Sequence, residues 1–130
     1  MVTTKNDQNA SNNWYLDTWC SNHMTGHKEW FVSIDDSVKT RVKFADDSFI
    51  RAEGMGRVMF QRQNGKTSYI ANVLYVPKMK NNLLSLGQLL DKGYEMTLED
   101  RMLKVFNKKR VLIFKAPLSQ NKTFKVPLTS

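Results

Sequence analysis

The stretch from Trp14 to His27, WYLDTWCSNHMTGH, gathers most of the residue types that can do chemistry in this chain. It holds one acid, Asp17, the only cysteine, Cys20, and both histidines, His23 and His27. Three chemistries are therefore open from the residue types alone. The stretch can form a metal site, a cysteine nucleophile, or a carboxylate that works as acid and base.

A zinc site is the first alternative, because Cys20, His23 and His27 have the spacing C-x2-H-x3-H. A structural zinc ion takes four ligands, and the sequence has no second cysteine or third histidine. A cysteine nucleophile has a histidine nearby, but no residue is indicated that would orient the histidine. We therefore expect no metal and no cofactor, with Cys20 packed as a small hydrophobic residue and the histidines in a turn.

The acid is the second focus, because Asp17 directly follows three large apolar residues. Partial burial of a carboxylate is costly without partners, so a second acid or a set of hydrogen-bond donors is expected around Asp17. Asp46 and Asp47 differ, since they lie in a turn-like segment where carboxylates usually cap backbone groups. From the residues alone, a structural and a catalytic role for Asp17 both remain open.

The elements that must position these residues are mostly strands. Val38, Val42 and Phe44 fall on one face of a run whose other face is basic, and Asn64-Gly65 is a strong hairpin signal. Gly54 and Gly56 indicate a bulge. The pattern predicts strands at 38–44, 49–60, 67–76, 83–84, 94–99, 102–106 and 110–115, and a short helix at 88–92. Short strands at this spacing predict an all-β barrel or sandwich.

Length and composition indicate one globular domain, with 130 residues, 41% hydrophobic and 25% charged. We expect a disordered linker at 1–13, the domain at 14–116 and a loosely ordered tail at 117–130. The sequence has no apolar run of membrane-spanning length, and its single cysteine is typical of a reducing compartment. A cytoplasmic protein without membrane contact is therefore expected.

The net charge of +8 raises the alternative of a nucleic-acid-binding module. The basic residues are spread over most of the chain, however, and their densest cluster, KVFNKKR at 104–110, fits a solvated hairpin tip equally well. We therefore keep nucleic-acid binding as a third alternative function, and expect at least a weak contact with polyanions through charge.

Several segments, in this order, resemble the protease region of copia-type retrotransposon polyproteins, most closely those of plants. They are WYLDTWCSNHMTGHKEWF, VKFADDS and VLYVPKMKNNLLSLGQLLDKGY. The resemblance is strong from Trp14 to Tyr94 and continues more weakly to about Val126. It implies a retropepsin-like closed β-barrel with a flap hairpin and one short helix, followed here by extra C-terminal strands.

The resemblance also assigns roles to residues. Asp17 is the implied catalytic carboxylate, paired with its copy in a homodimer, and Thr18 braces the two loops. The implied flap tip is Ala45, Asp46, Asp47 and Ser48, and Leu86 and Gly87 belong to a strand-glycine-helix element behind the active loop, where Gly87 allows close backbone approach. The implied substrate is a polyprotein or peptide in extended form.

Two departures from the family pattern affect catalysis. Trp19 stands where the Asp-Thr-Gly motif has glycine, although Cys20 after it is tolerable. An indole at this place pushes the paired loops apart or fills the cleft, and a displacement of about 1 Å can cost on the order of 100-fold in rate. Asp47 stands where many relatives have glycine. We therefore expect an aspartic endopeptidase whose activity is weakened or lost; the alternative is an inactive module that dimerises or binds polyprotein or relatives.

Overall fold

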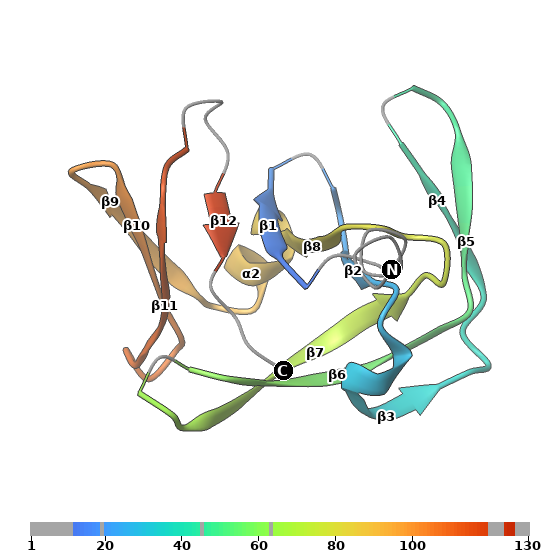
Figure 1. Cartoon of the computed structure of the whole chain (residues 1–130), viewed down its shortest axis with the longest axis horizontal. Coiled ribbons are helices and arrows are strands. Elements are labelled where there is room, and N and C mark those ends of the chain that lie inside the picture. The colour runs from blue at the N-terminus through green and yellow to red at the C-terminus, as the bar shows by residue number, and fades with distance from the viewer. Residues whose placement is uncertain (1–11, 19, 45, 63, 120–123, 127–130) are drawn as a thin grey trace, which may run out of the picture.

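The computed structural model describes residues 12–18, 20–44, 46–62, 64–119 and 124–126. Within them the chain forms twelve strands, a 3-10 turn η1 (Lys28–Trp30) and one short helix, α2 (Leu86–Asp91). Figure 1 shows a group of short central strands, with a long hairpin rising on one side and a smaller sheet on the other. This arrangement confirms the expected all-β barrel-type fold, with one short helix among the described residues.

The main sheet has seven strands in the order β12-β1-β8-β2-β7-β6-β3. The strands are β1 (Trp14–Asp17), β2 (His23–Thr25), β3 (Phe31–Asp35), β6 (Gly54–Gln61), β7 (Thr67–Tyr75), β8 (Asn82–Ser85) and β12 (Phe124–Val126). β1 and β2 follow each other in the chain, yet β8 lies between them, parallel to β1 and antiparallel to β2. The loop that joins β1 to β2 therefore crosses the end of β8, where α2 begins.

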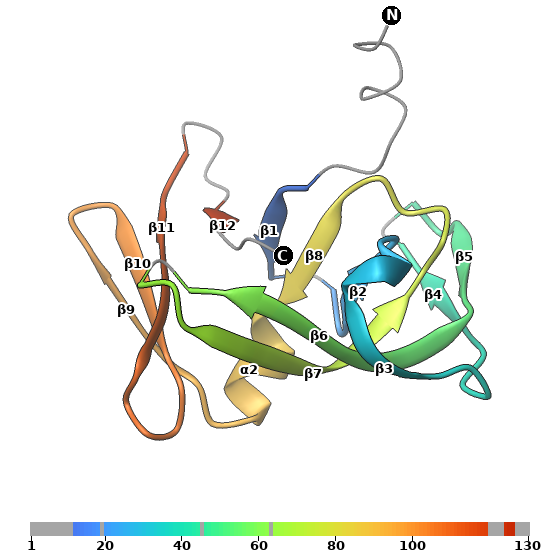
Figure 2. The same cartoon turned by 60° about the horizontal axis from the view of Figure 1, so that its bottom comes forward.

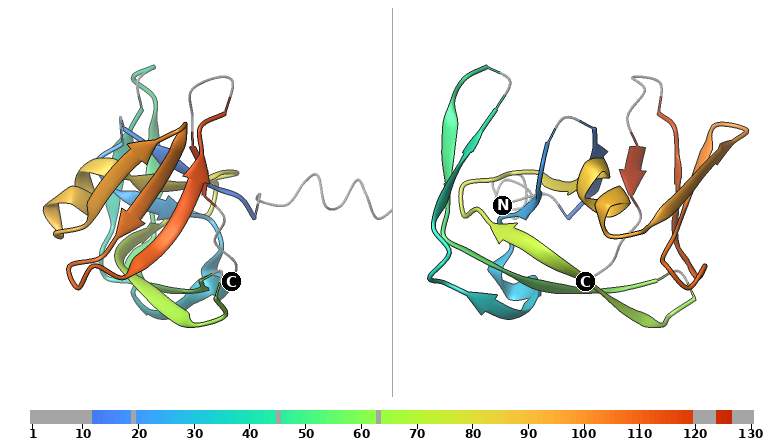
Figure 3. Two further views of the ribbon diagram at one scale, coloured as in Figure 1. Left: turned by 90° about the vertical axis from the view of Figure 1, so that its left-hand side faces the viewer. Right: turned by 180° about the vertical axis from the view of Figure 1, so that it is seen from behind.

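Two smaller sheets flank this one. β4 (Thr40–Lys43) and β5 (Phe49–Ala52) form a two-stranded hairpin, and β9 (Glu95–Glu99), β10 (Met102–Phe106) and β11 (Leu112–Pro117) form an antiparallel sheet. The two views of Figure 3 show that these sheets stand on opposite sides of the central strands. The predicted bulge is present in β6, between Gly56 and Val58, and Gly65 makes the predicted hairpin turn with a φ of 84°.

Most of the core lies between the main sheet and the C-terminal sheet. Trp14, Phe60 and Leu89 pack with Val105 and Phe114 in one cluster of buried side chains. The strands after residue 94 are therefore an integral part of the hydrophobic core, a role that periodicity alone does not reveal. A second, smaller cluster under the β4–β5 hairpin centres on Met24, Ala52, Leu74 and Val76.

The ends of the chain differ in part from the expected picture. Phe124–Val126, inside the segment expected to be a loose tail, forms β12 and pairs antiparallel with β1 (Figure 2). Residues 1–11 of the expected linker lie outside the described residues, so the domain limits 14–116 stay a prediction. Within the described residues, no helix has the length and apolar composition needed to cross a bilayer.

Candidate active site

Asp17 is the last residue of β1 and lies beside Ser85, the last residue of β8, in the parallel register. Alternation along β1 turns Trp14 and Leu16 into the core, so the half-buried Asp17 lies on the opposite face. Its Oδ1 accepts a hydrogen bond from the backbone N–H of Cys20 at 3.3 Å. The carboxylate therefore accepts a hydrogen bond from its own loop, and the expected set of donors around it stays a prediction.

Cys20 connects this loop to the start of α2. Its carbonyl accepts a hydrogen bond from the Ser85 hydroxyl at 2.8 Å, and its Sγ lies 3.8 Å from the Asp17 carbonyl oxygen. Burial, followed by the charge of Asp17, raises the pKa of the Cys20 thiol to about 11. A thiol with this pKa is almost entirely protonated at neutral pH, which argues against a cysteine nucleophile.

His23 is a second link between the loop and α2. It is 2% exposed at the start of β2, and its Nδ1 accepts a hydrogen bond from the backbone N–H of Ser85 at 2.9 Å. The backbone N–H of His23 donates in turn to Oε1 of Gln88 at 3.0 Å. Burial lowers the pKa of His23 to about 4, so the ring is neutral at pH 7. The expectation that His23 is ordinary turn structure is wrong, because a partner 62 residues away holds it.

His27 has a different role from His23. Its ring stacks on Trp30 with centroids 3.7 Å apart, and its Nδ1 lies 2.7 Å from Oε2 of Glu29, which lowers the pKa of that carboxyl. His23 and His27 are thus committed to separate contacts. In the described part of the chain, no three His, Cys, Asp or Glu side chains gather as a metal site.

A cavity of about 570 Å³ lies between the Asp17 loop and the β4–β5 hairpin. Asp17, Cys20 and Met24 line one wall, and β4 residues such as Arg41 and Val42 line the other. The cavity thus has Asp17 and apolar groups in one wall and positive charge on the hairpin. This is the space that an extended peptide would need to reach the carboxylate.

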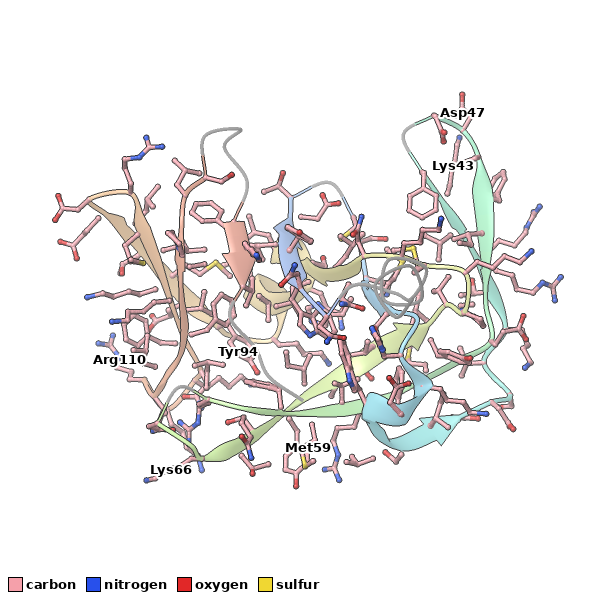
Figure 4. All side chains as sticks on the ribbon, viewed as in Figure 1. Lys43, Asp47, Met59, Lys66, Tyr94 and Arg110 are labelled. Atoms are coloured by element: carbon pink, nitrogen blue, oxygen red, sulfur yellow. The ribbon has the colours of Figure 1, made fainter. Side chains whose placement is uncertain are left out.

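The predicted flap tip is the turn of this hairpin. Oδ1 of Asp46 accepts hydrogen bonds from the Ser48 N–H at 3.0 Å and hydroxyl at 2.6 Å, and these contacts lower the pKa of Asp46. Asp47 has a φ of 69°, in the left-handed region that favours glycine, and its carboxylate pairs with Lys43 at 3.2 Å (Figure 4). Ala45, the remaining predicted tip residue, lies outside the described residues.

The other predicted site residues have mixed outcomes. Thr18 is exposed next to Asp17, and Leu86 is the half-buried first residue of α2. Inside one chain, a Cβ added at Gly87 would meet nothing nearer than the Ser85 hydroxyl at 3.9 Å, so the predicted close backbone approach at Gly87 stays a prediction. Trp19, which decides the expected loss of activity, lies outside the described residues.

Sequence reasoning missed the buried polar pair behind the loop. The Thr25 hydroxyl donates to Oδ1 of Asn82 at 2.6 Å, and Nδ2 of Asn82 donates to the Asn13 carbonyl at 2.8 Å. Both side chains are fully buried. The one signal in the sequence for this pair was the position of both residues beside apolar runs. A polar residue buried with such a run needs a hydrogen-bond partner. These bonds join β2 to β8 and so fix the strands that carry the loop.

The fold and the site together define the class of protein. It is an all-β domain in which a braced loop carries a carboxylate and faces a hairpin. Residues 14–94, well over half of the chain, match the family described as the β-barrel domain of Pol polyproteins. The chain belongs to this family, so it is a retroelement polyprotein domain. A search of curated proteins found no match.

Proposed function

We propose that this domain is a retropepsin-like aspartic protease module of a copia-type element, and that it works as a homodimer with one Asp17 from each chain. The observation that carries the proposal is the position of Asp17, at the end of β1 in the wall of the cavity under the β4–β5 hairpin. The insertion of β8 between β1 and β2 supports it, because the strand-glycine-helix segment thereby braces the loop.

The chemistry follows from bringing two such carboxylates together. Two carboxylates about 3 Å apart do not both ionise easily, so the pair holds one proton. The ionised member takes a proton from a water molecule that attacks the peptide carbonyl, and the neutral member donates to the carbonyl oxygen. Each chain supplies one loop, so activity depends on protein concentration.

Trp19 sets the level of this activity. A glycine in the family motif lets the two loops approach and directs its N–H toward the carboxylates. An indole in its place opposes both, so we propose that cleavage is weakened or lost while peptide binding and dimer formation persist. In that state the module holds extended polyprotein segments or pairs with intact relatives, in a reducing compartment such as the cytoplasm.

Three proteins test the proposal: the chain as given, Trp19→Gly and Asp17→Asn. Each is incubated with peptides from the parent polyprotein at pH 5.5 to 7, while sedimentation measures the dimer. We expect Trp19→Gly to cleave faster by on the order of 100-fold, and Asp17→Asn to be silent but still dimeric. Equal cleavage rates for the given chain and Trp19→Gly would show that Trp19 does not lower the activity. A dimeric but silent Trp19→Gly would contradict the protease assignment.

A further inference from the structure

The outer face of the β6–β7 hairpin carries a second surface, remote from the cavity. In Figure 4, Met59 and Lys66 lie at the lower margin of the molecule, whereas Lys43 and Asp47 of the flap lie at the top. Met59 pairs directly with Tyr69 across the two strands, and both are exposed, Met59 by 38% and Tyr69 by 46%. Single exposed apolar side chains are common, so exposure alone does not define this face.

Charge makes the face unusual. From Gly54 to Leu90 the sequence contains five lysines and arginines and no aspartate or glutamate, although the chain has twelve acids. Three of these cations belong to the β6–β7 hairpin: Arg57 on β6, with Arg62 and Lys66 at the turn. The hairpin therefore presents positive charge without a carboxylate of its own to neutralise it.

An arginine is stacked on the exposed aromatic ring. The guanidinium carbon of Arg57 lies 4.7 Å from the centroid of the Tyr69 ring, on the outer face of the sheet. Lys66 is exposed at the β6–β7 turn, next to Thr67, the first residue of β7.

We propose that this face, formed by Arg57 and Tyr69 with Lys66 at the adjoining turn, binds single-stranded nucleic acid. An unpaired base stacks on the Tyr69 ring or the Arg57 guanidinium, and a neighbouring phosphate contacts Lys66. An aromatic ring on a flat sheet favours an unpaired strand over a duplex, because bases inside a duplex have no free face. Cationic side chains and an exposed ring on one sheet are the combination that such sites use.

The test is fluorescence anisotropy with labelled oligouridine RNA of about 12 nucleotides, measured across salt concentrations. Tyr69→Ala should weaken binding about fivefold or more and leave the salt slope unchanged, whereas Tyr69→Phe, which keeps the ring, should bind as the parent does. Lys66→Gln should reduce the magnitude of the slope of log K against log salt by about 0.7. Circular dichroism verifies that each variant is folded.

Lys109→Gln is the matched charge control, because it removes one exposed cation from the densest basic cluster of the sequence. We expect it to have a smaller effect than Lys66→Gln. Equal effects of the two, unchanged binding by Tyr69→Ala, or no binding near 150 mM salt would each overturn the proposal. So would a Tyr69→Ala protein that loses dimer but keeps RNA affinity, since the face would then be a contact between copies. Asp17→Asn should bind RNA normally, which separates this surface from the protease proposal.

Discussion

Protonation of His23 should destabilise this domain at mildly acidic pH. The pKa of the ring is about 4 in the folded chain against an ordinary value of 6.5. Between these values the unfolded state binds more protons than the folded state, so stability falls as pH falls. The difference of 2.5 units corresponds to about 3 kcal/mol in full, of which about 2 kcal/mol is lost between pH 7 and pH 5.

Urea unfolding followed by tryptophan fluorescence measures this loss. The range from pH 7 to 5 suits the test because it lies above the usual titration range of Asp and Glu, including Asp46, whose pKa is lowered. His23→Asn keeps an acceptor for the Ser85 N–H but cannot take up a proton. Its stability should stay level over this range. A parent chain that also stays level, or a variant that loses as much as the parent, would refute the role given to His23.

Three further predictions concern single residues. Gly56→Ala should destabilise the fold by several kcal/mol in urea unfolding, because its Cβ would lie 2.0 Å from the Ser33 carbonyl oxygen; full stability would contradict this packing. Asp47→Gly should raise the free energy of unfolding by up to about 1 kcal/mol, since φ is 69° there, and a loss would count against the turn geometry. Cys20 should react with iodoacetamide at pH 8 about 100-fold more slowly than a thiol of pKa 9.0; an equal rate would contradict the burial and the effect of Asp17.

Local signals in the sequence predicted the hairpins well. Asn64-Gly65 predicted the β6–β7 turn, and the paired glycines of β6 predicted its bulge. The segment before Gly93 forms the expected short helix, although α2 begins at Leu86 because Ser85 caps it through the Gln88 N–H. These features depend on neighbours in the chain, which sequence patterns record directly.

Long-range pairings were out of reach of such patterns. β2 is three residues long and fully buried, and two of them, His23 and Thr25, are polar, so it lacks the alternation of a strand. The His23 ring and the Thr25 hydroxyl bond Ser85 and Asn82, which are 62 and 57 residues away in the sequence. β12 likewise owes its place to pairing with β1 across the whole domain. Asp17 was identified through the family resemblance, whereas the bonds that tie the following loop and β2 to Ser85 and Gln88 required the structure.

The concentration dependence of cleavage by Trp19→Gly tests the central claim most directly. With Asp17 from two chains forming one site, the rate per chain should rise in proportion to protein concentration below the dimer dissociation constant and level off above it. Mixing in an excess of Asp17→Asn should suppress the rate, because mixed dimers carry only one carboxylate. Two results would contradict the account. One is a rate per chain that stays constant while sedimentation reports monomers. The other is cleavage by the double variant that carries both Trp19→Gly and Asp17→Asn.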